Sequence, residues 1–276
     1  MKITIWGCRG SIPSPGPETT FYGGNTSCVS LETPESFIIL DAGSGIRRLG
    51  MDLAGKSRID IFLTHLHLDH IQGLGFFAPL YDLDAEVHIW GCASLTESLR
   101  SRLTRYLSPP IFPVRIRDFK SKLLIHEIGR EEFRLNDLQV TSDYVSHPSP
   151  TLGFRFCADN KVFTYIPDHD PVLGLPHALS DPQWISGFGL AKDADLLIHD
   201  AQYTRVEYED HLGWGHCSIE DSLQFAEICA VKKLLFFHHD PNRTDDDINA
   251  LHKQHINQNE SQMEISFAKE GETYIL

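Results

Sequence analysis

Short apolar segments bounded by glycine, proline or aspartate recur along the whole chain. They are rich in valine, isoleucine and aromatic residues, which pack well on a pleated surface and favour β-strands. The strands predicted in this way span residues 2–6, 28–31, 36–40, 59–63, 86–90, 123–128, 139–145, 152–156, 162–166, 196–199 and 233–237. Strands therefore dominate the predicted secondary structure.

Three other segments repeat apolar residues at helical spacing. The clearest is 218–230, in which Ile219, Leu223 and Ala226 share one face and Ser218 with Asp221 resembles a capping box. Segments 94–106 and 245–257 are predicted as further helices. Groups of strands with intervening helices, without strict alternation, predict two packed sheets covered by helices. No segment has the composition of a linker, so residues 1–276 are predicted to form a single domain.

The segment that follows the predicted strand 59–63 contains candidate metal ligands. It reads His65-Leu66-His67-Leu68-Asp69-His70, so four side chains that can bind a metal lie within six positions. Imidazole nitrogens and a carboxylate suit zinc, iron or manganese, and with the later histidines the pattern offers more ligands than one tetrahedral ion can use. The alternative is a polar turn with solvated histidines, which gains nothing from clustering ionisable rings at the end of a buried strand. The pattern therefore predicts a site for two metal ions.

Composition narrows the class of protein. With 41% hydrophobic and 22% charged residues, the 276-residue chain can bury a sizeable core. No apolar run is long enough to span a bilayer, and the chain begins with a strand pattern rather than a signal peptide, so we expect a cytoplasmic protein that does not bind membranes. The six cysteines are scattered without a C-x-x-C pair and are expected to be reduced core residues.

Net charge bears on the partner. A formal charge of −14 repels polyanions, and the sequence has no clear basic patch. We therefore expect a small substrate and no long nucleic acid.

The chain resembles the metallo-β-lactamase-fold hydrolases, in particular the branch of ribonuclease Z and the small cyclic-phosphate and phosphodiester hydrolases. The resemblance covers nearly the whole length. The motifs that carry it lie at residues 7–13, 23–27, 40–43, 64–70, 147, 168, 198–201, 215–218 and 237–241. It implies an α/β (α+β) fold, a four-layer αββα sandwich of two mixed sheets with outer helices and a dinuclear site along one edge.

The resemblance also implies a ligand set, which comprises His65, His67 and His147 for the first metal, Asp69, His70 and His238 for the second, and Asp168 as a bridge. This division suits two divalent cations, zinc in the first place or else manganese or iron, because one bridging carboxylate offsets charge between them.

His238, its neighbour His239 and Asp41 are all candidates for a place near the metals. His238 is preferred over His239, since adjacent residues of an extended segment point in opposite directions and only one can reach the site. His239 is then a surface ring or one that supports a ligand. Asp41 is interpreted as a carboxylate that orients a ligand histidine.

Three residues are expected to be catalytic: Asp69, His216 and Asp200. In enzymes similar to ribonuclease Z, a histidine after glycine, just before a helix, lies over the metals beside a carboxylate, and His216 and Asp200 match these positions. An imidazolium there would stabilise the transition state or protonate the leaving alkoxide. The alternative is that His216 only caps the next helix. His199 should point away from Asp200 by strand alternation.

Two features depart from the tRNA-processing enzymes of the family. Residues 147–168 leave no room for the arm that grips tRNA between the corresponding motifs. Segment 108–113, Ser-Pro-Pro-Ile-Phe-Pro, stands where the family varies its substrate-facing insertions. It is interpreted as a pocket wall, a homodimer contact, or a loop packed on its own core.

The function predicted from the sequence is a dinuclear metal-dependent phosphodiesterase that uses a metal-bridging hydroxide on a small phosphodiester or cyclic nucleotide. One alternative is a lactonase or thioesterase, since the same nucleophile attacks a carbonyl. Another is a redox or sensing module on the same fold, although such relatives carry glutamate where His67 stands and a flavodoxin partner domain, and this chain has neither.

Overall fold

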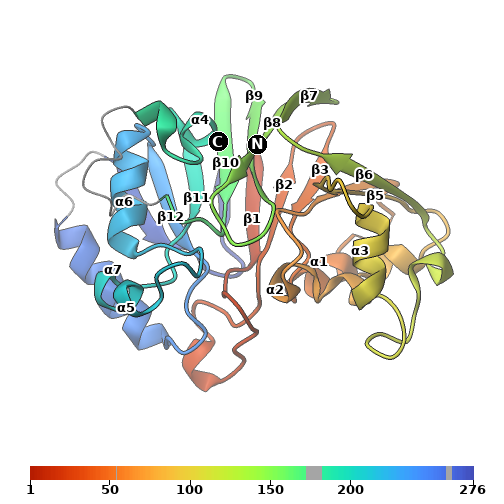
Figure 1. Cartoon of the computed structure of the whole chain (residues 1–276), viewed down its shortest axis with the longest axis horizontal. Helices are drawn as coiled ribbons and strands as arrows, with labels where there is room; N and C mark the ends of the chain where they lie inside the picture. The colour runs from red at the N-terminus through yellow and green to blue at the C-terminus, as the bar shows by residue number, and fades with distance from the viewer. Residues whose placement is uncertain (54, 172–181, 259–262) are drawn as a thin grey trace.

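Two seven-stranded sheets pack face to face and carry helices on their outer surfaces, so that the chain forms four layers (Figure 1). This architecture is that of a computed structural model, which describes residues 1–53, 55–171, 182–258 and 263–276. The predicted αββα sandwich of two mixed sheets is confirmed.

The first sheet has the order β14-β1-β2-β3-β4-β5-β6. Its strands are β1 (Lys2–Gly7), β2 (Cys28–Glu32), β3 (Phe37–Leu40), β4 (Arg58–Phe62), β5 (Glu86–Cys92), β6 (Lys122–Ile128) and β14 (Thr273–Ile275). Strands β3 to β6 run parallel to one another, whereas β14, β1, β2 and β3 pair antiparallel.

The second sheet has the order β13-β12-β11-β10-β9-β8-β7. Its strands are β7 (Glu131–Leu135), β8 (Leu138–Val145), β9 (Thr151–Ala158), β10 (Lys161–Ile166), β11 (Leu196–Asp200), β12 (Lys233–Phe237) and β13 (Glu264–Phe267). Strands β10 to β13 are parallel, and β7 to β10 pair antiparallel. Strand β8 therefore runs in the same direction as β10, so the residues that follow these two strands lie at the same edge of the sheet.

Three hydrophobic layers hold the sandwich together. Between the sheets, Phe62 of the first sheet meets Phe154 and Phe156 of the second edge to face, with ring centroids 5.4 and 5.8 Å apart. All three rings are fully buried, and burial of a ring of this size stabilises a fold by about 1.5–3 kcal/mol. Two further buried clusters join each sheet to its own helices.

The helices cover the outer faces. Helices α1 (Ile46–Met51) and α3 (Leu99–Tyr106) pack on the first sheet, and α4 (Phe188–Ala191), α6 (Ile219–Ile228) and α7 (Asp245–Gln258) pack on the second. Helices α2 (Leu68–Ile71) and α5 (Arg205–Asp210) lie in the loops after β4 and β11. The short 3-10 helices are η1 (Pro17–Thr19), η2 (Leu74–Phe76), η3 (Ala78–Tyr81), η4 (Ile116–Asp118) and η5 (Pro182–Trp184).

Every strand predicted from the sequence is present, within two residues at each end, but β7, β13 and β14 were missed. All three lie at or beside a sheet edge, and β7 reads Glu-Glu-Phe-Arg-Leu, whose polar residues hide the apolar alternation. Edge strands expose more side chain to water, and their sequences carry a weaker hydrophobic signal.

The predicted start of α6 is confirmed, whereas that of α3 is not. Ser218 caps α6, since its hydroxyl accepts a hydrogen bond from the backbone N–H of Asp221 at 3.0 Å. The predicted start of α3 at residue 94 is wrong, because Ser98 is the N-cap and accepts from the N–H of Ser101 at 3.2 Å. The residues before it turn back on themselves, with the Ser94 hydroxyl accepting from the N–H of Thr96.

The six cysteines are unpaired, and all but the half-buried Cys157 are buried, as predicted. None of the helices within the described ranges is long and apolar enough to cross a bilayer.

Candidate metal centre

Carboxyl ends of parallel strands lie at the same edge of a sheet, and this rule assembles the site. His65 follows β4, His147 follows β8, Asp168 follows β10 and His238 follows β12. Because β8, β10 and β12 run in one direction, their following residues converge on the loop after β4. Residues more than a hundred positions apart in the chain are thereby brought together.

The first group of converging side chains consists of His65, His67, His147 and Asp168, whose potential ligand atoms lie within 4.8 Å of one another. His147 Nε2 is 3.2 Å from His67 Nδ1 and 3.8 Å from Asp168 Oδ2. Burial lowers the pKa of His65 well below its usual range, and the imidazole of His70 lowers it further. His65 is therefore neutral, as an imidazole must be to bind a metal.

The second group consists of Asp69, His70, His238 and again Asp168. His70 Nε2 lies 3.0 Å from Asp168 Oδ1, and His238 Nε2 lies 3.1 Å from Asp69 Oδ2. Three of these residues are nearly inaccessible to solvent and Asp69 is only slightly exposed. The seven residues predicted as ligands therefore converge in two adjacent clusters.

Asp168 is the residue that the two clusters share. Its Oδ2 lies 3.6 Å from His65 Nε2, while its Oδ1 faces His70. Burial alone would raise the pKa of Asp168, but the surrounding imidazoles of His238, His70 and His65 hold it well below its usual range. Asp168 is thus a carboxylate that faces both clusters, since its Oδ2 also lies 3.5 Å from His238 Nε2 of the second cluster.

Hydrogen bonds on the far side of each ring fix its orientation. Asp41 Oδ2 binds His70 Nδ1 at 2.8 Å, Gln202 Oε1 binds His238 Nδ1 at 2.9 Å, and the carbonyl of Gly215 binds His147 Nδ1 at 2.7 Å. In all three rings Nε2 is therefore the atom that points to the clusters. Partners of this kind orient and strengthen the histidine ligands of metal sites, and Asp41 has the role predicted for it.

Two glycines allow the rings to approach. A Cβ at Gly10 would lie 2.4 Å from His238 Nδ1, and a Cβ at Gly215 would lie 2.0 Å from Pro148 Cδ. Gly215 also has a φ of +85°, which favours glycine. Gly10 and Gly215 are thus explained by close packing around the site.

The polar atoms of the clusters fit divalent cations. Among the described residues, His65 Nε2, His70 Nε2 and Asp168 Oδ1 are buried and make no hydrogen bond, although the last two atoms lie 3.0 Å apart as an ion pair. Buried polar atoms are rarely left unsatisfied, because each costs about 1–3 kcal/mol. Imidazoles and carboxylates that converge in this way match the ligands of zinc, iron and manganese.

His216 and Asp200 form a pair beside the clusters. Asp200 is fully buried, and its Oδ2 lies 2.6 Å from His216 Nδ1. Burial by itself would lower the pKa of His216, but the charge and hydrogen bond of Asp200 raise it to about 9. The ring stacks on His238 with centroids 4.7 Å apart. Because Ser218 caps α6, the alternative that His216 only caps this helix is wrong.

The structure separates His238 from His239, but for a reason other than strand alternation. Strand β12 ends at Phe237, and His238 has a φ of +58°, so it lies in a left-handed turn rather than in an extended segment. This turn carries its ring to Asp69. The expectation of a surface ring for His239 is wrong, since it is 1% exposed and its Nε2 donates to the carbonyl of Ala268 at 2.8 Å.

Other residues that support the site were not predicted from the sequence. Gln202 and the phenol of Tyr165, which donates to Asp41 Oδ2 at 3.0 Å, stand outside the motifs that predicted the site. The backbone N–H of Ser11 donates to Asp69 Oδ2 at 2.9 Å. His199 points away from Asp200, as predicted, and its Nδ1 lies 2.7 Å from Ser222 Oγ.

Comparison with known proteins places these features in a family. The Beta-lactamase superfamily domain matches residues 37–239, which is more than half of the chain. Ribonuclease Z from Thermococcus gammatolerans is 25% identical over 78% of this chain and 78% of its own length. The metallo-β-lactamase fold protein YhfI from Bacillus subtilis superimposes with a TM-score of 0.72 at 18% identity, covering 99% of both chains. A diphosphatase of the PhnP family gives a TM-score of 0.70 at 17% identity, covering 100% of this chain and 97% of the other. The chain therefore belongs to the β-lactamase superfamily and has the metallo-β-lactamase fold.

Proposed function

We propose that this protein is a metal-dependent phosphodiesterase that holds two divalent cations and cleaves a small phosphodiester. The proposal builds on the family to which the chain belongs and on the paired histidine and carboxylate clusters. The observation that carries the choice of phosphorus chemistry is the ion pair of His216 with the buried Asp200, next to both clusters.

The ligands divide between two ions. His65, His67 and His147 would hold one, Asp69, His70 and His238 the other, and Asp168 both. When bound, divalent cations at these positions activate water and neutralise charge on the oxygens of the phosphoryl group. Burial favours the neutral form of His65, His67 and His147 by lowering the pKa of each imidazole. Hydrogen bonds to Nδ1 orient the rings of His70, His147 and His238.

His216 supplies a proton where a leaving group departs. Its Nδ1 is occupied by Asp200, so Nε2 carries the proton that can be donated. Asp200 is fixed in turn by the backbone N–H of His169 and of Gln202, each at 3.0 Å. A rigid carboxylate keeps the ring in one orientation and favours its cationic form. Departure of an alkoxide from phosphorus needs such an acid.

Asp69 contributes a second polar group. Burial alone would raise its pKa, but the nearby imidazoles of His70 and His238 lower it. Asp69 is therefore a carboxylate at the working pH, and its position allows it to orient an attacking water molecule by a hydrogen bond.

The substrate is proposed to be small, although the similar protein from T. gammatolerans is named ribonuclease Z. Between His147 and Asp168 the chain forms only β9 and β10, joined by a two-residue turn at Asp159 and Asn160, both with positive φ. No arm projects within residues 147–168. The net charge of −14 also opposes binding of a long polyanion.

The proposal is tested by metal analysis together with a substrate panel. Protein purified without chelator and supplied with zinc or manganese should hold two ions per chain. It should hydrolyse bis-p-nitrophenyl phosphate and a cyclic nucleotide faster than p-nitrophenyl phosphate or a lactone, and should leave a tRNA precursor uncut. Saturation at one ion would exclude the dinuclear site. Faster turnover of the lactone than of every phosphoester would show a carbonyl hydrolase instead.

A further inference from the structure

A pocket of about 560 Å³ adjoins the first cluster, and one of its walls is His67. We call it the His67 pocket. It lies between the loop after β4, the second half of α3 and the turn that follows α3. Its volume falls within the range of pockets that hold small organic ligands, about 300–1,000 Å³. A molecule whose phosphoryl group reaches the metal ligands can therefore extend into this pocket.

The walls of the pocket are mainly apolar. Leu66, Leu68 and Ile71 form one side, and Tyr106 and Ile111 face them from α3 and the following turn. Leu68 and Ile111 are 59% and 67% exposed, which is unusual for such large apolar side chains. Exposed apolar residues that gather around a concave site mark a surface that binds an apolar group.

The segment 108–113 builds part of this wall. Phe112 is only 6% exposed and packs edge to face on Phe76, with ring centroids 5.4 Å apart. Its neighbour Ile111 faces the pocket. Two of the interpretations drawn from the sequence thus hold together, because Phe112 anchors the segment in the core while Ile111 forms a pocket wall.

The pocket also carries positive charge. Arg102 and Arg105 line it, and the described residues of its lining include no acidic side chain. Arg105 forms an ion pair with Glu97, but its side chain is 74% exposed, and exposed pairs of this kind are weak. Arg102 Nη2 donates to the backbone carbonyl of Cys92 and lies 3.7 Å from Glu127 Oε1, whereas Arg102 Nε has no hydrogen-bond partner among the described residues. Arg105 is the more exposed of the two guanidinium groups and can therefore attract an anion, while Arg102 adds to the positive charge of the wall.

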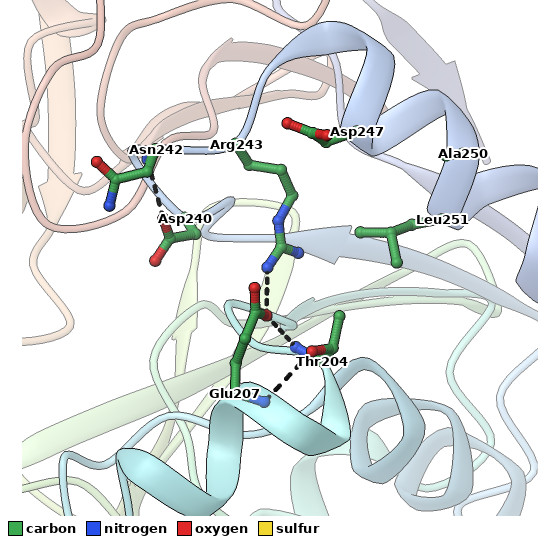
Figure 2. Close-up of a pocket in the computed structure, with 8 residues that line it drawn as sticks. All are labelled: Thr204, Glu207, Asp240, Asn242, Arg243, Asp247, Ala250 and Leu251. Carbon is green, nitrogen blue, oxygen red and sulfur yellow. Dashed lines mark hydrogen bonds and ion pairs between the residues drawn. The ribbon is translucent and has the colours of Figure 1, made fainter.

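Another hollow, of about 390 Å³, differs in this respect (Figure 2). Arg243 is the arginine of its lining, and its Nη2 is held by Glu207 Oε2 at 2.6 Å. Asp240 and Asp247 add further negative charge. An anionic substrate would be repelled there, so of the two hollows the His67 pocket is the one suited to it.

We propose that the His67 pocket receives one ester arm of the substrate, and that this arm is apolar or aromatic and carries a second negative charge, such as a carboxylate or a further phosphate. The specificity rests on the proposed phosphodiesterase function. The apolar walls remove the arm from water, and Arg105 together with Arg102 pairs with its charge.

Three substrates that share one leaving group test the proposed specificity of the His67 pocket for the ester arm. They are methyl, benzyl and 4-carboxybenzyl p-nitrophenyl phosphate, which differ only in the group that remains on phosphorus. Burial of the phenyl ring should raise kcat/KM by about 10- to 100-fold over the methyl ester. The carboxylate should add a further preference of up to about 5-fold, the size expected for a partly exposed ion pair.

Two variants divide the contributions. Arg105→Gln should remove most of the preference for 4-carboxybenzyl over benzyl and keep the preference for benzyl over methyl. Ile111→Asp should reduce both, because it places a carboxylate in the apolar wall. Arg117→Gln is the matched control, since Arg117 is 72% exposed, lies outside the pocket lining and loses the same charge. It should leave both ratios unchanged.

A binding measurement separates failure of the pocket from failure of the function. The metal-loaded wild type and Ile111→Asp proteins are titrated by calorimetry with methylphosphonate and benzylphosphonate. Tighter binding of benzylphosphonate by the wild type, lost in Ile111→Asp, supports the pocket even where no diester is hydrolysed. Equal binding of both phosphonates, or diester hydrolysis without preference among the three arms, would overturn the proposal while leaving the phosphodiesterase function in place.

Discussion

Replacing His216 by asparagine tests the proton donor. The side chain amide of asparagine can keep a hydrogen bond to Asp200, which lies 2.6 Å from His216 Nδ1, but it cannot deliver a proton as Nε2 does. Alanine would instead leave the buried carboxylate of Asp200 without this partner, at a cost of about 3–5 kcal/mol when a buried pair is broken. His216→Asn therefore isolates the chemistry from the stability of the fold.

The size of the effect follows from the ion pair. Asp200 raises the pKa of His216 from 6.5 to about 9, against the opposing effect of burial. The pair with Asp200 therefore favours the imidazolium form, which is the form that can donate a proton. Loss of a general acid typically lowers the rate by about 10²–10⁴-fold, which corresponds to about 2.7–5.4 kcal/mol.

The assay compares leaving groups. A cyclic nucleotide releases a poor alkoxide leaving group that needs a proton, whereas bis-p-nitrophenyl phosphate releases a phenolate that needs little assistance. His216→Asn should lose about 10²–10⁴-fold in kcat on the first substrate and far less on the second. Metal content and melting temperature are measured on the same preparations. His211→Asn, at a half-buried histidine that directly follows α5, is the matched control.

Equal losses on both substrates, with metals retained, would refute the role of proton donor. Stabilisation of transition-state charge by the His216 imidazolium would then be the better account. Unchanged rates on both substrates would remove His216 from the mechanism altogether.

Three further expectations follow from the site. Asp168→Ala should lose at least one metal ion and most activity, since it removes the carboxylate shared by the two clusters; elemental analysis and turnover decide, and full metal content at normal rate would show that Asp168 is no ligand. His238→Ala should weaken metal binding in a zinc titration, whereas His239→Ala should lower the melting temperature and keep the metals, because His239 bonds the carbonyl of Ala268; the reverse ranking would contradict the assignment. Burial lowers the pKa of His239 from 6.5 to about 3, so unfolding takes up a proton between these pH values, and the free energy of unfolding falls as pH decreases through this window. In urea titrations at a series of pH values, His239→Gln should reduce that slope by about 1.4 kcal/mol per pH unit, and an unchanged slope would show that His239 titrates normally.

The cluster His65, His67, Asp69 and His70 could be predicted from sequence because its members are close along the chain and follow one strand. Spacing of this kind is a local property, so it survives without knowledge of the fold. His147, Asp168 and His238 carry no such local signal. They were reached through the order of motifs shared with a family, and the converging strand ends of β8, β10 and β12 give the physical reason for that order.

Tertiary contacts decided what lies around the ligands. Gln202 and Tyr165 support the site through side chains whose partners are distant in sequence. The residues next to them in the chain do not predict that role. The His67 pocket has the same origin, since α3 and the loop after β4 meet only when the first sheet has formed.

By itself the sequence determined the alternation of buried strands, the cluster after β4 and the negative net charge, because each depends on the identity and spacing of nearby residues. Only the tertiary structure decided that His238 follows its strand in a left-handed turn and contacts Asp69. The tertiary structure also decided that Ile111 faces a pocket while Phe112 anchors the segment 108–113 in the core. These outcomes depend on which side of each residue a distant segment packs, and that is a property of the folded chain.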